Sequence, residues 1–196
     1  MFSYLTIINF KTKTMTTLKI HNIETAPKGS KDFLTKSQKD YGMIPGLHGV
    51  LAESPGLFEA YKTIHELFVN SAFNNEELTV VWQTINVEHA CHYCVPAHTA
   101  IAKMMKVDDS ITAALRNETP LENPKLEALR AMTLIIVRNR GHVTQNELNN
   151  FYATGYKERQ VLDIILGLSQ KIISNYTNHI ANTPVDVAFQ TFAWSK

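Results

Sequence analysis

Apolar residues along this chain recur at intervals of three and four positions, the spacing that places them on one face of a helix. The stretch PGLFEAYKTIHELFVNS, residues 55–71, shows this pattern. Its apolar face consists of Leu57, Tyr61, Ile64, Leu67 and Phe68, and its polar face of Glu59, Lys62 and Glu66. No stretch of the sequence alternates between apolar and polar positions for long enough to indicate a strand. The pattern therefore predicts an all-α fold.

Residues that start and end helices divide this pattern into segments. The sequence predicts helices over residues 29–42, 55–71, 74–90, 108–117, 123–142 and 157–184, with a further capped start at Thr144 and Glu147. The stretch TPLENP, residues 119–124, is the clearest linker and a possible domain boundary. We expect a single all-α domain over residues 29–196, preceded by a disordered or loosely ordered tail over residues 1–28. Met15, within this tail, is an alternative start of the chain.

Composition narrows the classes of partner. The 19 Lys and Arg residues nearly balance the 18 Asp and Glu residues, and no stretch concentrates basic side chains, so no nucleic-acid partner is expected. No apolar run approaches the roughly 20 residues that span a bilayer, so we expect a soluble protein without a membrane partner. Two cysteines spaced by two residues do not make the disulfide framework of a secreted protein, which favours a reducing cytoplasm.

Both cysteines lie in one short motif, EHACHYCVPAHTA. At about 100° per residue on a helix, Cys91, Cys94 and His98 share one face. Pro96 predicts a helix that begins near His92, because proline is tolerated only in the first turn. Cys91 would then lie at or just before the cap and Cys94 in the first turn, where helix amides and a paired cysteine lower a thiol pKa. His98, one turn beyond Cys94, is placed to accept or return its proton.

Two other interpretations of the motif stay open. Free cysteines are often just small buried apolar residues. Zinc could instead be bound by both cysteines and His98, with Glu88, His89 or His179 as a fourth ligand. Structural zinc sites usually take their second pair of ligands from a distant segment, and the sequence has no second Cys-x-x-Cys and no His-x-x-x-His. A redox pair is therefore favoured, and no metal or cofactor is expected.

The segment EHACHYCVPAHTAIAKMMKV resembles the active-site segment of the alkylhydroperoxidase D and carboxymuconolactone decarboxylase-like superfamily. The similarity extends to YGMIPGLHGVLAESPGLFEAY and, in residues 141–186, to the peroxidase-related branch, and so covers most of the chain. This resemblance implies an all-α fold, homo-oligomers that are often trimers or hexamers, and no prosthetic group. It also implies roles for three residues: Cys94 attacks a peroxide, Cys91 resolves the sulfenic acid into a disulfide, and His98 joins a proton relay.

The sequence departs from the family pattern at one position. The family's relay glutamate lies twelve residues before the first cysteine, where this chain has Thr79, whose hydroxyl cannot exchange a proton near neutral pH. Glu77 and Glu88 are candidate substitutes, because their separation of eleven residues returns them to one helix face. Glu88 is preferred because it lies three residues before Cys91, whereas Glu77 also suits the positive start of a helix dipole.

A second polar cluster interrupts the last apolar helix. The segment NYTNH contains Asn175, Asn178 and His179, and it resembles a segment of the peroxidase-related branch. These side chains could line the pocket, but a hydrogen-bonded contact between helices or subunits is the plainer interpretation.

The sequence therefore predicts a thiol-dependent peroxidase or disulfide oxidoreductase that uses a hydroperoxide substrate and an external dithiol reductant. Two alternatives remain. One is a carboxymuconolactone decarboxylase-type lyase, which would leave the thiols idle. The other is a redox partner protein that exchanges disulfides with another protein and turns over little peroxide.

Overall fold

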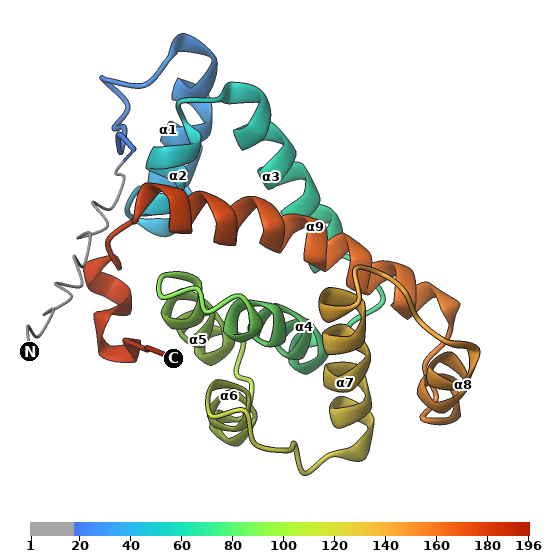
Figure 1. Ribbon diagram of the computed structural model, residues 1–196. Coiled ribbons are helices and arrows are strands. Elements are labelled where there is room, and N and C mark those ends of the chain that lie inside the picture. Colours follow the sequence, from blue (N-terminus) through green and yellow to red (C-terminus); the bar gives the residue numbers. More distant parts are fainter. Residues whose placement is uncertain (1–17) are drawn as a thin grey trace, which may run out of the picture.

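A computed structural model describes residues 18–196, which form nine α-helices and two short 3-10 helices (Figure 1). The first five α-helices are α1 (Lys31–Tyr41), α2 (Gly46–Leu51), α3 (Pro55–Val69), α4 (Asn75–Glu88) and α5 (Cys94–Met104). The remaining helices are α6 (Asp109–Arg116), α7 (Pro124–Arg138), α8 (Gln145–Ala153), α9 (Glu158–Ala181) and the 3-10 helices η1 (Lys28–Ser30) and η2 (Val187–Phe192). This part of the chain contains no strand, so the all-α prediction is confirmed.

Side-chain caps determine where two of the predicted helices begin. The side chain of Asn74 accepts a hydrogen bond from the Glu77 amide, and the Glu77 carboxylate accepts one from the Asn74 amide. Thr144 and Glu147 form the same reciprocal pair at the start of α8. Each pair satisfies amides that the first helical turn leaves without partners. The predicted starts of both helices are confirmed.

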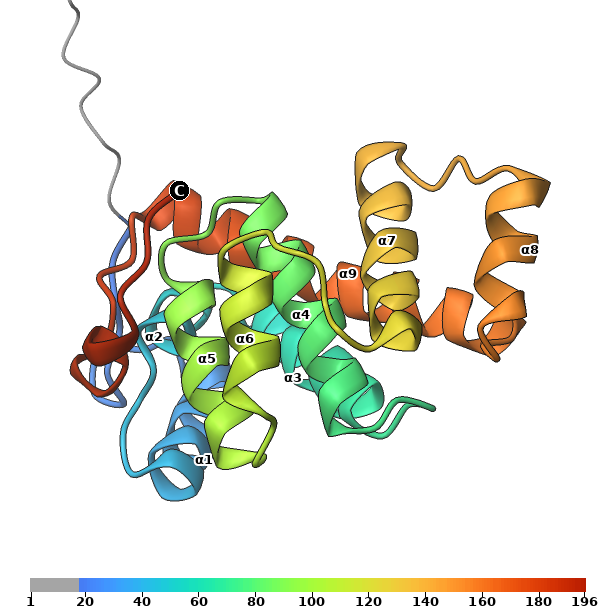
Figure 2. The same cartoon turned by 90° about the horizontal axis from the view of Figure 1, so that it is seen from below.

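The long helix α9 crosses the molecule and α4 lies beside it (Figures 1 and 2). On α9 pack α2, α3, α4, α5 and α7, whereas α4 also packs on α5, α6 and α7. The linker at residues 119–124 connects α6 to α7, and both of these helices pack on α4. None of the helices between residues 18 and 196 is long and apolar enough to cross a membrane.

Buried apolar side chains form two clusters. The larger one surrounds α4 and α7 and includes Phe68 and Trp82. The other lies among α1, α2, α3 and the connection between α4 and α5, and it includes Phe58 together with Cys91 and Cys94. Both cysteines are therefore part of a packed core, where their surroundings are fixed by neighbouring helices.

Residues 18–28, which fall within the expected N-terminal tail, contact the helical part of the chain. The amide of His21 donates to the carbonyl of Gly49 at 2.9 Å. This close approach requires a glycine, because a Cβ atom at residue 49 would lie 2.8 Å from the carbonyl oxygen of His21. The rest of the expected tail, residues 1–17 with Met15, lies outside the described residues.

Candidate active site

The connection between α4 and α5 carries the cysteine motif. After α4 ends at Glu88, the amide of Cys91 donates to the carbonyl of Asn86 at 2.9 Å, a bond that closes the end of α4. Between them Ala90 adopts a φ of 51°, the left-handed conformation common at helix ends. Cys91 thus still completes α4, and the next helix can begin only after a turn.

Helix α5 begins at Cys94, two residues later than the predicted start near His92. The amide of Cys94 donates to the Sγ atom of Cys91 at 3.3 Å, so the first amide of the helix is satisfied by the other cysteine. Pro96 is the third residue of α5, still in the turn where a missing amide leaves no helical bond unmade. Both cysteines are free thiols.

Both thiols are buried, and Cys94 contacts α9. Cys91 is fully buried and Cys94 is 2% exposed. From α9, Asn178 donates its Nδ2 hydrogen bond to the Sγ atom of Cys94 at 3.2 Å. Asn175 donates to Asn86 Oδ1 at 3.0 Å, and Asn86 in turn donates to the carbonyl of Cys94 at 3.4 Å. The asparagines of the NYTNH segment therefore join helices, as expected, and Asn178 also reaches the thiol.

The surroundings separate the acidities of the two thiols. Burial by itself would raise the pKa of Cys94. Other effects outweigh burial and lower this pKa to about 6: a hydrogen bond from Cys91, the charge of Lys171 and the side-chain amides of α9. The pKa of Cys91 is raised, first by its hydrogen bond with Cys94 and then by burial. Cys94 is therefore the more acidic of the two thiols, and Cys91 is the thiol that donates to it.

His98 lies one turn after Cys94, but its described hydrogen bond is with Lys171. Its Nε2 atom lies 2.8 Å from the Nζ atom of that lysine, and its Nδ1 atom has no hydrogen-bond partner. The ring packs on Trp82, with 4.8 Å between ring centroids. Burial, and then the charges of Lys171 and His65, lower the pKa of His98 well below its ordinary value, so the ring is neutral at pH 7. The hydrogen bond with Lys171 is therefore the described path by which His98 could exchange a proton with a thiol.

Lys171 is the residue that sequence reasoning missed. It is 1% exposed, and no carboxylate in residues 18–196 forms an ion pair with it. Burial lowers the pKa of Lys171, and the two thiols raise it. Lys171 lies four residues before Asn175 and seven before Asn178, so the three share one face of α9. That spacing of polar residues within an apolar helix was the available signal.

Glu77 and Glu88 contact other partners. Glu77 caps the start of α4 through Asn74 and pairs with the Nζ atom of Lys125 at 3.3 Å. Glu88, at the other end of α4, accepts hydrogen bonds from Arg138 at 2.7 and 2.8 Å, which lower the pKa of its carboxyl. Eleven helical residues separate the two glutamates by about 17 Å along the axis. The described hydrogen bonds connect neither carboxylate to the thiols.

The segment after α9 covers the motif from outside. The carbonyl of Thr183 lies 3.0 Å from the Nε2 atom of His92. The hydroxyl of Tyr93 donates to the carboxylate of Asp186 at 2.6 Å, and this carboxylate also accepts from the amide of Gly46 at 3.1 Å. Further along, η2 packs on α5. The motif is therefore held between α9 and the segment that follows it.

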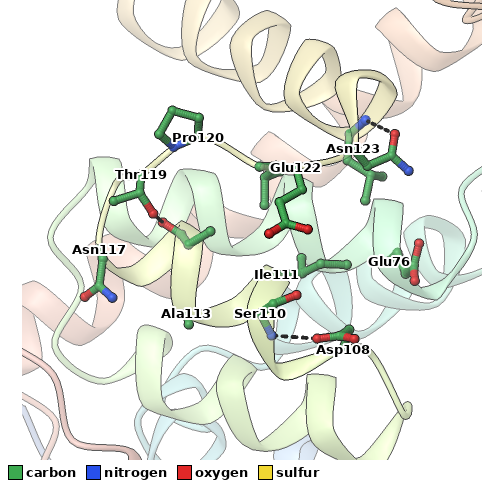
Figure 3. Close-up of a pocket in the computed structure, with 13 residues that line it drawn as sticks. Glu76, Asp108, Ser110, Ile111, Ala113, Asn117, Thr119, Pro120, Glu122 and Asn123 are labelled. Atoms are coloured by element: carbon green, nitrogen blue, oxygen red, sulfur yellow. Dashed lines mark hydrogen bonds between the residues drawn. The ribbon is translucent and has the colours of Figure 1, made fainter.

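An open hollow of about 490 Å³ lies elsewhere, between α6 and the linker that leads into α7 (Figure 3). Acidic side chains on its wall include Glu76, Asp108 and Glu122, and the Asp108 side chain caps α6. No residue of the cysteine motif lines it. Within residues 18–196, no group of three or more His, Cys, Asp or Glu side chains is arranged to hold a metal ion.

The whole fold has counterparts among solved structures. An uncharacterized peroxidase-related protein from Ralstonia eutropha JMP134, described as an alkylhydroperoxidase AhpD core, matches with a TM-score of 0.79 and 16% identity over 89% of this chain and 94% of that chain. The chain has the AhpD-like fold. A peroxidase-related protein from Silicibacter sp. TM1040, also uncharacterized, matches with a TM-score of 0.72 and 16% identity over 91% and 96% of the two chains. No protein-family model and no curated protein sequence matches the chain.

The AhpD-like fold confirms what the sequence resemblance implied about architecture. At 16% identity the likeness concerns the fold and does not extend to activity. The site combines an acidic buried thiol, a second thiol in contact with it and a buried lysine and histidine. Such a combination favours chemistry at sulfur.

Proposed function

We propose that this protein is a thiol-dependent peroxidase in which Cys91 and Cys94 cycle between a dithiol and a disulfide. The observation that carries the proposal is the difference in acidity between two thiols in contact: Cys94 has a lowered pKa and Cys91 a raised one. A thiolate is the form that attacks a peroxide, and a neighbouring thiol can condense with the resulting sulfenic acid. The fold shared with proteins described as peroxidase-related supports the same assignment.

The cycle has three steps. The thiolate of Cys94 attacks the outer oxygen of a hydroperoxide, so that an S–O bond forms, the O–O bond breaks and the released alkoxide takes up a proton to leave as an alcohol. Cys91 then loses its proton, and its sulfur displaces the hydroxyl group of the sulfenic acid, which leaves as water. An external dithiol finally reduces the disulfide by exchange and is itself oxidised to a disulfide.

This scheme uses no metal and no organic cofactor. A cytoplasmic location belongs to the proposal, because dithiol reductants are kept reduced there. His98 takes part through its hydrogen bond with Lys171. The relay role of Glu88 or Glu77 stays a prediction, and it would need water or a movement to connect a carboxylate with the thiols.

One equivalent of hydrogen peroxide is expected to remove both free thiols and to form an intramolecular disulfide between Cys91 and Cys94. The thiols are already in contact, so the second step needs no approach of a distant residue. Titration of free thiols and the intact mass, which should fall by the two thiol hydrogens, measure the outcome. Two thiols that stay titratable after peroxide, or zinc that co-purifies at one ion per chain, would contradict the proposal.

The two alternative functions give different results in the same assay. A disulfide-exchange partner would be oxidised by another disulfide and would turn over little peroxide in the presence of a dithiol. A lactone-decarboxylating lyase would keep its activity after both thiols are alkylated, because its reaction does not use them. The lyase reaction does not use the contacts that lower the pKa of Cys94, so we favour the peroxidase over the lyase.

We also propose a cyclic homo-oligomer, trimeric or hexameric. Apolar side chains form an exposed stripe on the outer face of α9, each between 40% and 65% exposed: Leu162, Ile165, Ile172 and Tyr176. A stripe of this kind on a protein surface favours burial against another chain. Light scattering at micromolar concentration is expected to give the mass of an oligomer, and Leu162→Glu is expected to reduce it. A monomer mass for the unchanged protein would contradict this prediction.

A further inference from the structure

We propose that Lys171 is the counter-ion of the Cys94 thiolate and the proton donor for the oxygen that leaves when a peroxide is reduced. The second role rests on the proposed function, whereas the ion pair can be measured without any peroxide.

Two contacts join α5 and α9 at the site. Cys94 and His98 lie four residues apart on α5, and Lys171 and Asn178 lie seven residues apart on α9. Asn178 donates to the sulfur of Cys94 at 3.2 Å, and the Nζ atom of Lys171 lies 2.8 Å from the Nε2 atom of His98. The earlier residue of one helix thus meets the later residue of the other. This antiparallel crossing brings the lysine amine into the same buried contact as the sulfur.

The charge of a buried lysine needs compensation. Moving an ammonium group out of water is unfavourable unless an anion or several acceptors replace its hydration. Lys171 is 1% exposed and has no carboxylate partner in the described chain. The groups that raise its pKa are the two thiols, first Cys94 and then Cys91. Of these two, Cys94 is the one that ionises near neutral pH, so its thiolate is the compensating anion.

The other titratable groups that face this pair are neutral at pH 7. They are Tyr61 and His65 of α3, Tyr93 just before α5, His98 of α5, and Cys91. Burial raises the pKa of Tyr93. Burial raises the pKa of Tyr61, and it lowers the pKa of His65 to about 4. Burial likewise lowers the pKa of His98, and the pKa of Cys91 is raised. From α4 the indole of Trp82 faces the site, and it does not titrate. The lysine and the thiolate are therefore each other's charge partner.

The proton balance of the reaction fits this pair. When the Cys94 thiolate attacks the peroxide, the released alkoxide takes a proton from the ammonium of Lys171 and leaves as an alcohol. The lysine becomes a neutral amine, which its burial favours once the thiolate is consumed. The amine then takes the proton of Cys91 as that sulfur attacks the sulfenic acid, and it passes the proton to the departing hydroxide to form water. Reduction by the dithiol returns two protons, one to Cys91 and one to the amine.

Thiolate absorbance in the ultraviolet, measured against pH in a Cys91→Ser background, tests the ion pair. Because a serine hydroxyl keeps a hydrogen-bond donor at position 91, the midpoint for Cys94 is expected to stay near pH 6. Lys171→Met removes a positive charge, which favours the neutral thiol, so the midpoint should rise by about two units and the thiolate fraction at pH 7 should fall roughly tenfold. Lys125→Met is the matched control, because this lysine pairs with Glu77 and is expected to leave the midpoint unchanged.

Several outcomes would overturn the proposal. A midpoint above pH 8 in the chain that retains Lys171 would show that no ion pair exists, and this measurement requires no change at the lysine. If the midpoint shifted in Glu88→Gln and did not shift in Lys171→Met, the proton would be assigned to Glu88 and not to Lys171. By contrast, a thiolate that depends on Lys171 but leaves both thiols of the unchanged protein unreacted with peroxide would refute the peroxidase function and keep the ion pair.

Discussion

Replacing Cys94 with serine is expected to stop peroxide consumption, whereas replacing Cys91 with serine is expected to leave the first reaction and stop the cycle after it. A serine hydroxyl is not ionised near neutral pH and is a much weaker nucleophile than a thiolate, so the rate with peroxide should fall by about a thousandfold or more in Cys94→Ser. In Cys91→Ser the thiolate and its contacts with α9 remain, but no second thiol can condense with the sulfenic acid.

A single turnover without reductant separates the two variants. Peroxide consumption followed by stopped flow gives the rate of the first step, and a sulfenic-acid trap with intact mass identifies its product. The two replacements form a matched pair, since both remove one buried free thiol from the same core cluster. An inert Cys91→Ser and an active Cys94→Ser would instead assign the attack to Cys91, and the order of acidity proposed for the two thiols would then be reversed.

Phe68→Ala is expected to lower the free energy of unfolding by about 3–5 kcal/mol, because it removes a fully buried ring from the larger core cluster. The ring lies 5.3 Å from that of Trp82 and 6.0 Å from that of Phe73, centroid to centroid. It also packs against Gly167 of α9, where a Cβ atom would lie only 2.7 Å from the ring. The cavity left by alanine has close-packed walls that can collapse only partly.

Thermal and denaturant unfolding measure this loss, and the melting temperature is expected to fall by roughly 6–20 °C for a chain of this size. Met104→Ala is the control, because Met104 is 78% exposed and its truncation should change stability by less than about 0.5 kcal/mol. A loss below about 1 kcal/mol in Phe68→Ala would mean that α3 and α9 repack around the vacancy.

The sequence determined the helices and most of their boundaries. The apolar pattern of a helix involves residues three and four positions apart, and a cap such as Asn74 with Glu77 involves residues three positions apart. Both can therefore be recognised from the sequence alone. The start of α5 was predicted two residues early. The reason is that the amide of Cys91 donates to a carbonyl at the end of α4, so the preceding helix, and not Pro96, determines where α5 can begin.

Local spacing likewise placed the two cysteines close together and His98 one turn away. It did not reveal Lys171, because this lysine meets His98 across 73 positions of the chain, and Asn178 meets Cys94 across 84. The helical spacing of Glu77 and Glu88 shows which side of α4 they occupy, but not which residues pack there. In the structure Glu77 forms an ion pair with Lys125, and Glu88 forms one with Arg138. Only tertiary packing decides which groups are buried together. Burial lowers the pKa of Lys171, whereas the pKa of Cys94 is lowered against the effect of burial by hydrogen bonds and by the charge of that lysine.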